Sequence, residues 1–325
     1  MESDLEQARR GDHAAFERVV SGHRRELTAH CYRMLGSPQD AEDALQEALV
    51  GAWRGMAGFD GRSSVRTWLY TIATHACLRL AAQRPRRLMT PDHVPARQQT
   101  DDLGEVIPGP VFLEPWPDDP DARYLRRESV ELAFVAALQH LPGTQRAVLI
   151  LREVLEWSAE EVAEMLGTTT AAVNSALQRA RKAVDERVPS VSQADELAAL
   201  GSDGRRQLVD AFVSAWERSD VEGLSRLLTE DARFTMPPLP AWFEGRADVL
   251  RFLAERAFAT PWRLVPLHAN GQLGFACYQS MGGAFRLGAV NLLTVRGRQV
   301  AEINGFLDPA VHRRFDLPEI LSRQR

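Results

Sequence analysis

Arginine, hydroxyl and aromatic side chains alternate in one segment near the N-terminus, residues 61–87. A loop of glycine and serine opens it, a helix can start near Val65, and a basic run ends it. Rings can stack on unpaired bases while guanidinium groups hold phosphates, so this pattern is typical of single-stranded DNA binding. The rings could also belong to a helix-bundle core. The candidate DNA-contacting residues are Gly61, Arg62, Ser63, Ser64, Arg66, Trp68, Thr71, His75 and Arg79.

Residues 141–188 contain a second candidate for DNA contact. Ser158, with Glu161 three residues later, predicts a capped helix, and a Gly-Thr-Thr turn leads into another helix. Three helices joined this way predict a helix–turn–helix whose last helix can enter the major groove. Such a motif can be purely structural, but small polar and basic side chains on its exposed face favour DNA binding. That face comprises Thr170, Ala171, Asn174, Ser175, Gln178, Arg179 and Arg181.

Carboxylates gather on a third segment, residues 40–54. Its apolar residues fall at three- and four-residue spacings and form one stripe, so we expect the acids to line a different face of a helix. The interpretations left open are a solvated face on a bundle helix and a docking face for a partner. The candidate docking residues are Asp40, Glu42, Asp43, Gln46, Glu47 and Trp53.

Between these segments, residues 89–125 are rich in proline, aspartate and glycine. Prolines at positions 115 and 117 exclude both a helix and an interior strand there. Acids and apolar side chains alternate around them, so the stretch is either an inert tether or an element with contacts of its own. The residues in question are Leu113, Glu114, Pro115, Trp116 and Asp118.

These segments define the expected domains. Residues 5–88 and 126–190 read as helical modules separated by the linker at 89–125, and a polar joint at 188–204 precedes a last domain, 203–325, that begins with helices and ends in strands. The 325 residues carry a formal net charge of −5, which argues against wholesale nucleic-acid coating. We find no secretory signal, no apolar run long enough for a membrane span and no metal-ligand spacing of cysteines, and therefore expect a cytoplasmic protein.

The two helical modules together resemble an extracytoplasmic-function (ECF) sigma factor of RNA polymerase, which has regions 2 and 4 only. The matching stretches are "CYRMLGSPQDAEDALQEALVGAWR", "FDGRSSVRTWLYTIATHACLRL" and "SAEEVAEMLGTTTAAVNSALQRAR". The resemblance implies that residues 40–53 dock on the polymerase β′ clamp helices, that residues 61–79 melt and read the −10 element, and that residues 170–181 read the −35 element. It also implies contact with the β flap, no cofactor and no enzymatic activity.

Two departures from the family pattern fall on the presumed −10 surface. His75 stands where the family commonly has asparagine, and Arg79 stands near a position where it has an acid. A more basic surface favours phosphate contact, and we expect the preferred −10 sequence to be unusual.

Residues 203–325 resemble the SnoaL-like branch of the NTF2-like fold, in the wording "AWERSDVEGLSRLLTEDARFTMPP". The implied fold class is therefore multidomain, with two all-α sigma domains (a region 2 helical bundle and a region 4 helix–turn–helix) and an α+β NTF2-like cone. In this class the linker pattern near residues 112–118 also recurs, so the last domain could grip that segment. Residues that could line a pocket in the cone are Trp216, Phe234, Trp242, His268 and Tyr278.

The last domain has three possible roles. It could regulate the sigma factor through an intramolecular contact with the sigma core or linker, which we favour; it could sense a ligand; or it could be an enzyme using Asp231 or His268 as a base. The alternative functions for the whole chain are a bifunctional protein whose pocket binds or converts a small molecule, and a plain helix–turn–helix regulator. The latter leaves residues 61–87 without a purpose.

Overall fold

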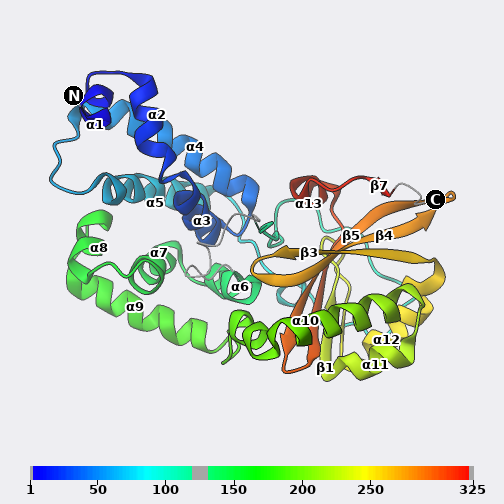
Figure 1. Ribbon diagram of the computed structural model, residues 1–325. Helices are drawn as coiled ribbons and strands as arrows, with labels where there is room; N and C mark the ends of the chain where they lie inside the picture. Colours follow the sequence, from blue (N-terminus) through cyan, green and yellow to red (C-terminus); the bar gives the residue numbers. More distant parts are fainter. Residues whose placement is uncertain (1–2, 119–130, 322–325) are drawn as a thin grey trace. The chain divides into compact units, whose positions relative to one another are not determined.

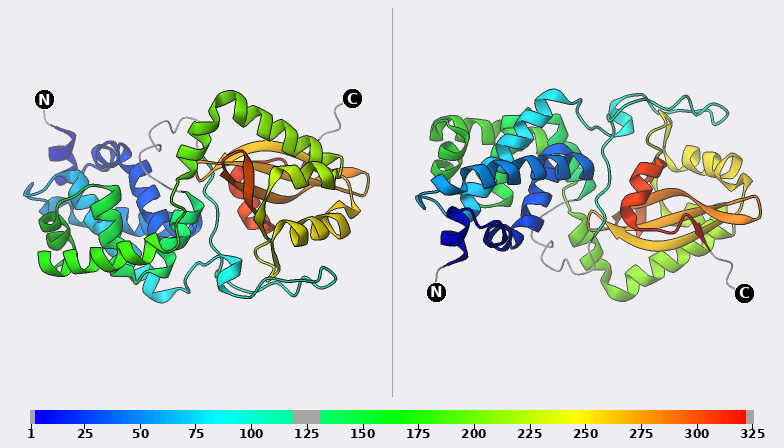
Figure 2. Two further views of the ribbon diagram at one scale, coloured as in Figure 1. Left: turned by 90° about the horizontal axis from the view of Figure 1, so that it is seen from below. Right: turned by 90° about the horizontal axis from the view of Figure 1, so that it is seen from above.

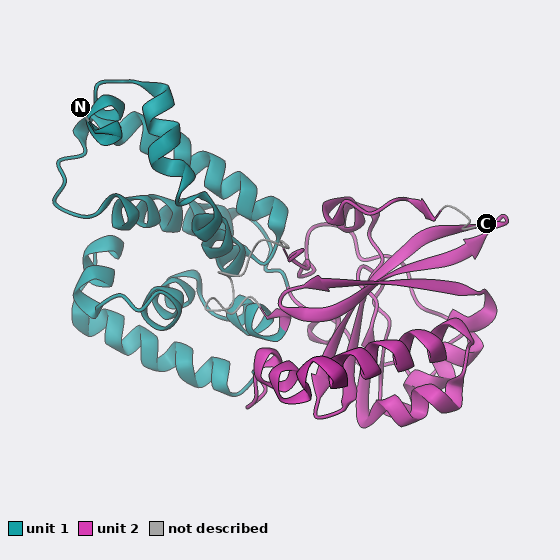
Figure 3. Ribbon diagram, viewed as in Figure 1, with its two compact units in different colours: residues 1–87, 133–188 teal, residues 88–132, 189–325 magenta. Residues whose placement is uncertain are grey.

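The computed structural model describes residues 3–118 and 131–321, which form two compact units (Figure 3). The first unit comprises residues 1–87 and 133–188, and the second comprises residues 88–132 and 189–325. The described part of the expected linker therefore belongs to the C-terminal unit rather than standing apart. Residues 119–130, which include the predicted boundary between linker and second helical module, lie outside the described residues.

The first half of unit 1 is a helical bundle (Figure 1). It contains α1 (Asp4–Arg9), α2 (His13–Ser21), α3 (Arg24–Leu35), α4 (Pro38–Gly55), a 3-10 turn η1 (Met56–Gly58) and α5 (Val65–Gln83). Ser37 caps α4 by accepting a hydrogen bond from the backbone N–H of Asp40, and Ser64 caps α5 in the same way from Thr67. Buried alanines along α4 let it pack closely with α3 and α5; they are Ala41, Ala44, Ala48 and Ala52.

The second half of unit 1 contains the predicted helix–turn–helix. Its elements are α6 (Leu132–His140), α7 (Gly143–Leu149), a π-helical continuation η4 (Ile150–Val154), α8 (Ala159–Leu166) and α9 (Thr170–Asp185). Ser158 and Glu161 form the expected capping box at the start of α8, and Gly167 ends that helix with a left-handed φ of 61°. The buried stripe of α9 is Val173, Ala176, Leu177, Ala180 and Val184.

Unit 2 is built on one curved sheet. Its strands are β1 (Leu228–Thr235), β2 (Trp242–Glu244), β3 (Trp262–Ala269), β4 (Gln272–Met281), β5 (Ala284–Arg296), β6 (Gln299–Phe306) and β7 (Ile320–Leu321). The strand order is β2-β1-β6-β5-β4-β3, with β7 paired to β5. Among the strands that the structure describes, β1 and β6 pair in parallel and the other pairs are antiparallel.

Helices α10 (Gln193–Glu217), α11 (Val221–Leu227) and α12 (Arg246–Glu255) pack with the sheet, and η5 (Ala257–Ala259), α13 (Pro309–His312) and η6 (Arg313–Phe315) complete the unit (Figure 2). The polar joint expected at 188–204 was wrong, because α10 begins at Gln193 and kinks only at Gly201. The reason is tertiary: Leu197 is buried in the core, and the Gln193 side chain exchanges two hydrogen bonds with the backbone of Val295. No helix in the described part of the chain is long and apolar enough to cross a membrane.

Candidate nucleic-acid and polymerase interfaces

The predicted −35 residues share one exposed face of α9. Thr169 starts the helix by accepting a hydrogen bond from the backbone N–H of Ala172. Every predicted side chain on this face is exposed except Thr170, which is half-buried, and Arg181 forms an ion pair with Glu153 at 2.5 Å. The face lies opposite the buried stripe, so the helix can present it to a groove without disturbing the core.

The predicted −10 residues are divided between an exposed loop and a half-buried helix face. Residues 61–64 are exposed, whereas Arg66, Trp68, Thr71 and His75 are half-buried along α5. Trp68 packs on Phe59, with ring centroids 5.0 Å apart. The sequence left open that these rings belong to the core of the helical bundle, and for the aromatic residues that interpretation is therefore partly correct.

Two of these α5 residues contact the helix–turn–helix within unit 1. The guanidinium of Arg66 lies 5.5 Å from the ring centroid of Trp157, and His75 Nε2 donates a hydrogen bond to the Met165 carbonyl at 2.9 Å. Arg79 instead pairs with Glu47 at 2.6 Å on the surface. Sequence patterns gave no signal for Trp157 or Met165, because both partners lie about 90 residues away along the chain.

The acidic face of α4 is exposed at Glu42, Gln46 and Glu47 and half-buried at Asp43. Trp53, also half-buried, packs edge-on against Phe16 with centroids 5.2 Å apart. A docking surface on this helix would therefore consist of the first three side chains with Asp43 and Trp53 at its border.

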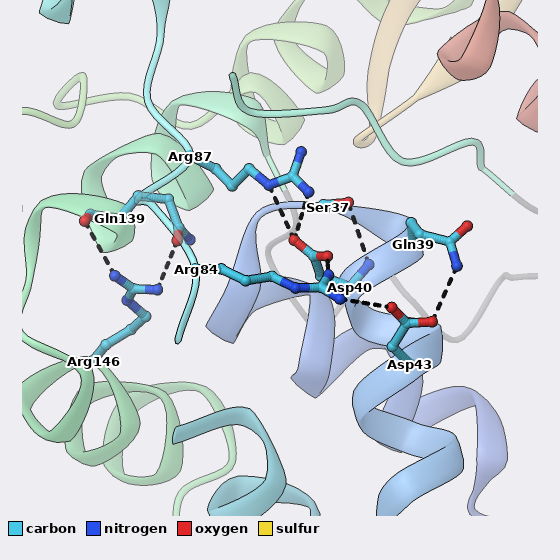
Figure 4. A network of polar contacts seen from close by, with 8 residues as sticks. All are labelled: Ser37, Gln39, Asp40, Asp43, Arg84, Arg87, Gln139 and Arg146. Carbon is cyan, nitrogen blue, oxygen red and sulfur yellow. Dashed lines mark hydrogen bonds and ion pairs between the residues drawn. The ribbon is translucent and has the colours of Figure 1, made fainter. Parts of the chain in front are cut away.

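Asp40 does not belong to this surface, which corrects the expectation of a solvated acid there. Its side chain is 4% exposed, and its carboxylate accepts hydrogen bonds from Arg87 Nη2 at 2.6 Å and Nε at 3.0 Å (Figure 4). Arg84 pairs with Asp40 as well and bonds Asp43 at 3.1 Å. The basic run after α5, which could have served phosphate contact, thus fastens the start of α4.

The linker lies along unit 2 as a strap, residues 88–118. The Arg97 N–H donates to the Trp242 carbonyl at 2.9 Å, and the Trp242 indole N–H donates to the Val94 carbonyl at 2.8 Å. Further on, the Ile107 N–H bonds the Pro238 carbonyl at 3.0 Å. The strap therefore covers the free edge of β2, which is one of the two edge strands of the sheet.

The end of the strap is held by the turn between β3 and β4, where Asn270 and Gly271 adopt left-handed φ values of 54° and 68°. Asn270 Oδ1 accepts from the Trp116 N–H at 2.7 Å, and the Asn270 N–H donates to the Trp116 carbonyl at 2.9 Å. Asp118 accepts from the Gly271 N–H at 3.1 Å, and its own N–H donates to the His268 carbonyl at 3.2 Å. We call these four hydrogen bonds the clasp.

Aromatic side chains pack in a continuous series inside the cone of unit 2. Neighbouring ring centroids lie 4.6–6.3 Å apart in the series Phe275, Phe212, Trp216, Phe234, Phe252 and Phe243. All six belong to the buried core. This interior is thus occupied by the protein's own rings, as in a packed core.

The predicted pocket residues do not form one lining set. Trp216 and Phe234 stack in the core, while His268 is exposed. Trp242 precedes the core residue Phe243 in β2 and Tyr278 follows the core residue Cys277 in β4, so both point to the opposite face of the sheet. The expectation of a shared pocket was therefore wrong. Alternation within each strand does not say which residues of different strands share a face; the pairing register of the strands decides that.

The environment of Asp231, one of the two candidate bases, does not suit a catalytic base. Asp231 is exposed and ion-paired with Arg296; hydrogen bonds from Arg296 and then Thr229 lower the pKa of its carboxyl to about 2. A carboxylate stabilised in this way is a poor proton acceptor near neutral pH. Among the described residues, no cluster of three or more histidines, cysteines and acids could hold a metal ion.

Comparison with known protein families agrees with this architecture. Family models match residues 19–87 (Sigma-70 region 2), residues 131–184 (Sigma-70, region 4) and residues 209–303 (SnoaL-like domain). The class of protein is therefore a two-region sigma factor with a SnoaL-like extension.

Relatives specify the class further. The chain is 42% identical over 324 residues to "ECF RNA polymerase sigma factor SigG" of Mycobacterium tuberculosis, covering 96% of this chain and 86% of that protein, and it belongs to the family of ECF RNA polymerase sigma factors. It is also 30% identical to "RNA polymerase sigma-H factor" of Pseudomonas aeruginosa, over 56% of this chain and 90% of the relative.

The fold is shared with a solved structure. The crystal structure of Mycobacterium tuberculosis ECF sigma factor SigJ matches with a TM-score of 0.60 and 22% identity, covering 92% of this chain and all of that one. The predicted family and multidomain fold class are confirmed. So is the prediction that the chain is a transcription initiation factor and not an enzyme, which rests on the family.

Proposed function

We propose that this sigma factor, when free, keeps its inter-module linker bound to the SnoaL-like domain, and that this attachment regulates its use by core RNA polymerase. In the family the linker enters the polymerase, so a strap held on unit 2 must leave it before the holoenzyme is complete. The clasp is the observation that carries the proposal, because it holds the backbone of the linker itself at Trp116 and Asp118.

The remaining interfaces follow from the exposed surfaces. Glu42, Gln46 and Glu47 on α4 would dock on the β′ clamp helices. The exposed loop 61–64 and α5 would trap unpaired −10 bases, and α9 would read the −35 element, while the helix–turn–helix would also meet the β flap. Binding energy from these promoter contacts would offset the unpairing of the −10 duplex. Since core polymerase works in the cytoplasm, we place the protein there.

The clasp has the strength expected of a reversible attachment. Each hydrogen bond contributes roughly 0.5–1.5 kcal/mol net, so four of them hold the segment by a few kcal/mol. Asp118 is partly buried, and this burial raises the pKa of its carboxyl, with the Gly271 N–H and His268 acting in the opposite sense. Polymerase can therefore compete for the linker without unfolding the domain.

A matched set of variants tests the proposal. Asn270→Gly with Asp118→Ala removes two clasp bonds while glycine keeps the left-handed turn, whereas Asp118→Asn removes the charge but retains an acceptor oxygen. We expect the double variant to lose hydrogen-exchange protection at residues 112–118 and to initiate promoter-directed transcription at roughly tenfold lower sigma concentration, as loss of about 1.4 kcal/mol implies. Asp118→Asn should behave like the wild type.

The outcome against regulation is equally definite. If the double variant exposed its linker but core binding and transcription were unchanged, the strap would be only a tether. If Asp118→Asn matched the double variant, the linker charge rather than the clasp would carry the effect.

A further inference from the structure

The two DNA-reading modules make a specific contact within unit 1, centred on one side chain. Trp157 lies in the turn before α8 and is 8% exposed. Its ring meets that of Tyr70 edge-on, with centroids 4.9 Å apart and planes at 84°, and Arg66 lies over both rings at 4.9 Å and 5.5 Å. Arg66 is fixed in turn by Glu26, which accepts from its Nε at 2.8 Å.

This arrangement has the chemistry of a site for a nucleobase. An arginine plane beside an aromatic ring is how proteins hold an unpaired base, and an indole has nearly the size and the π-face of a purine. Farther along α5, His75 hydrogen-bonds the Met165 carbonyl of α8. Both contacts fall on residues that the −10 assignment needs, and both come from the helix–turn–helix.

A second set of contacts holds the modules together away from the DNA surface. Gln139 of α6 donates to the Arg33 carbonyl at 3.1 Å, and Arg146 of α7 donates to the Met34 carbonyl, so both bond the last turn of α3. Arg146 also donates to Gln139 Oε1 at 2.6 Å. Burial, and then repulsion from Arg86, lower the pKa of Arg146 to about 10.

These contacts use polar groups that water can satisfy equally well once the modules separate. The hydrogen bonds of Arg146 to Met34, Gln139 and Leu141 all end on neutral oxygens, so burying its charge is costly and this cost weakens the closed arrangement. Interfaces between the modules of one chain are often polar in this way, and they then resemble the interfaces of transient protein complexes. The closed form is therefore suited to open when a partner competes.

We propose that in the free protein Trp157 occupies the place on Arg66 and Tyr70 that an unpaired promoter base takes after melting. The helix–turn–helix thus masks the −10-reading helix until the two modules separate. The inference rests on the assignment of α5 to the −10 element, and it adds a masking residue that lies outside both predicted DNA surfaces.

Binding of a fluorescein-labelled, mixed-sequence single-stranded DNA to the full chain, without polymerase, tests the mask. Trp157→Ala should increase affinity about tenfold, because the competent form is no longer outcompeted by the indole. Trp157→Phe preserves an aromatic ring over Arg66 and should stay within about twofold of the wild type. Hydrogen exchange along α5 should rise in the alanine variant only.

Further variants keep the inference falsifiable. If Trp157→Ala failed to fold by circular dichroism, Gln139→Met, which loosens the modules from the other side, should still raise affinity. Adding Arg66→Ala to Trp157→Ala should abolish the gain. No gain in affinity and no added exchange in a folded Trp157→Ala would overturn the mask. Two other results would overturn the mask by refuting the −10 assignment of α5, whatever the clasp variants do in transcription. One is faster hydrogen exchange along α5 without higher affinity for the DNA, and the other is higher affinity that persists when Arg66→Ala is added.

Discussion

At the scale of single residues, Asp40 shows how a charge pattern can be misassigned. The sequence places it in the same acidic series as Glu42 and Glu47, and helical spacing alone gives no reason to separate them. What separates them is Arg87, 47 residues later, whose side chain is only 6% exposed in the ion pair. Local patterns cannot predict a partner at that distance.

Removing this carboxylate should therefore affect stability rather than docking. Asp40→Ala removes the carboxylate that accepts two hydrogen bonds from the buried Arg87 guanidinium, and removing one partner of a buried ion pair costs about 3–5 kcal/mol. We expect urea denaturation to show a decrease of that order, measured against Asp43→Ala as the control. Asp43 is half-buried and its pair with Arg84 is near the surface, so its loss should cost under about 1 kcal/mol. Equal effects for the two would show that Asp40 is not the fastening residue.

Another buried residue, His30, makes the stability of unit 1 depend on pH. It is fully buried against Tyr70, its Nε2 contacts Thr74 Oγ1 at 2.9 Å, and burial, reinforced by Arg33, lowers its pKa to about 3. In the unfolded chain this histidine has an ordinary pKa near 6.5, so below that pH the unfolded chain binds a proton that the folded chain does not bind. Stability is therefore full above about pH 6.5 and is lost as the pH falls from there towards 3.

Urea unfolding at pH 7 and pH 5 measures this effect. The wild type should lose about 2 kcal/mol more than His30→Gln over this interval, since each pH unit below 6.5 costs about 1.4 kcal/mol. Other groups titrate in both proteins, so the difference between them isolates His30. Equal losses of stability in the wild type and His30→Gln would contradict the role of His30 in this pH dependence.

At the scale of elements, start signals were the most predictable features. Ser64 and Ser158 cap helices α5 and α8 as expected, and the C-terminal domain begins with helices followed by strands, as its sequence predicts. The joint at 188–204 failed because its proline, glycines and serines indicate a break, whereas Ser192 caps a helix whose Leu197 packs in the core beside the sheet. Caps are encoded locally, whereas that helix depends on tertiary contacts.

Helix α9, the proposed −35-reading helix, carries a prediction of its own. Asn174 lies exposed in its N-terminal half, where side chains of this fold reach base edges. Asn174→Ala should weaken binding of the holoenzyme to a −35-containing duplex about tenfold, as loss of one good base contact implies. Asp185→Asn, at the far end of the same helix, is the control. An unchanged affinity for the alanine variant would remove Asn174 from the proposed interface.

At the scale of the whole molecule, the sequence predicted the modules, and the resemblance implied that the last domain could grip the linker, but neither specified the residues in contact. The linker was correctly set apart as non-helical, and the structure shows which of its residues, Trp116 and Asp118 among them, bond the SnoaL-like domain. Similarly, the separate DNA surfaces could be proposed from residue types, whereas the contact of Trp157 with Arg66 could not. Such contacts join segments that lie far apart in the sequence, and the spacing of residues within one segment does not predict its partner in another.

The strap has one more consequence, which concerns solubility. While Arg97 bonds the Trp242 carbonyl, the outer edge of β2 is covered and Trp242 is nearly excluded from water. When the linker leaves for polymerase, the same strand presents unpaired backbone groups beside an exposed indole, the combination through which sheets add foreign strands. Transcriptional engagement would thus uncover an aggregation-prone edge, and the resting form would protect the protein during storage as well as hold it inactive.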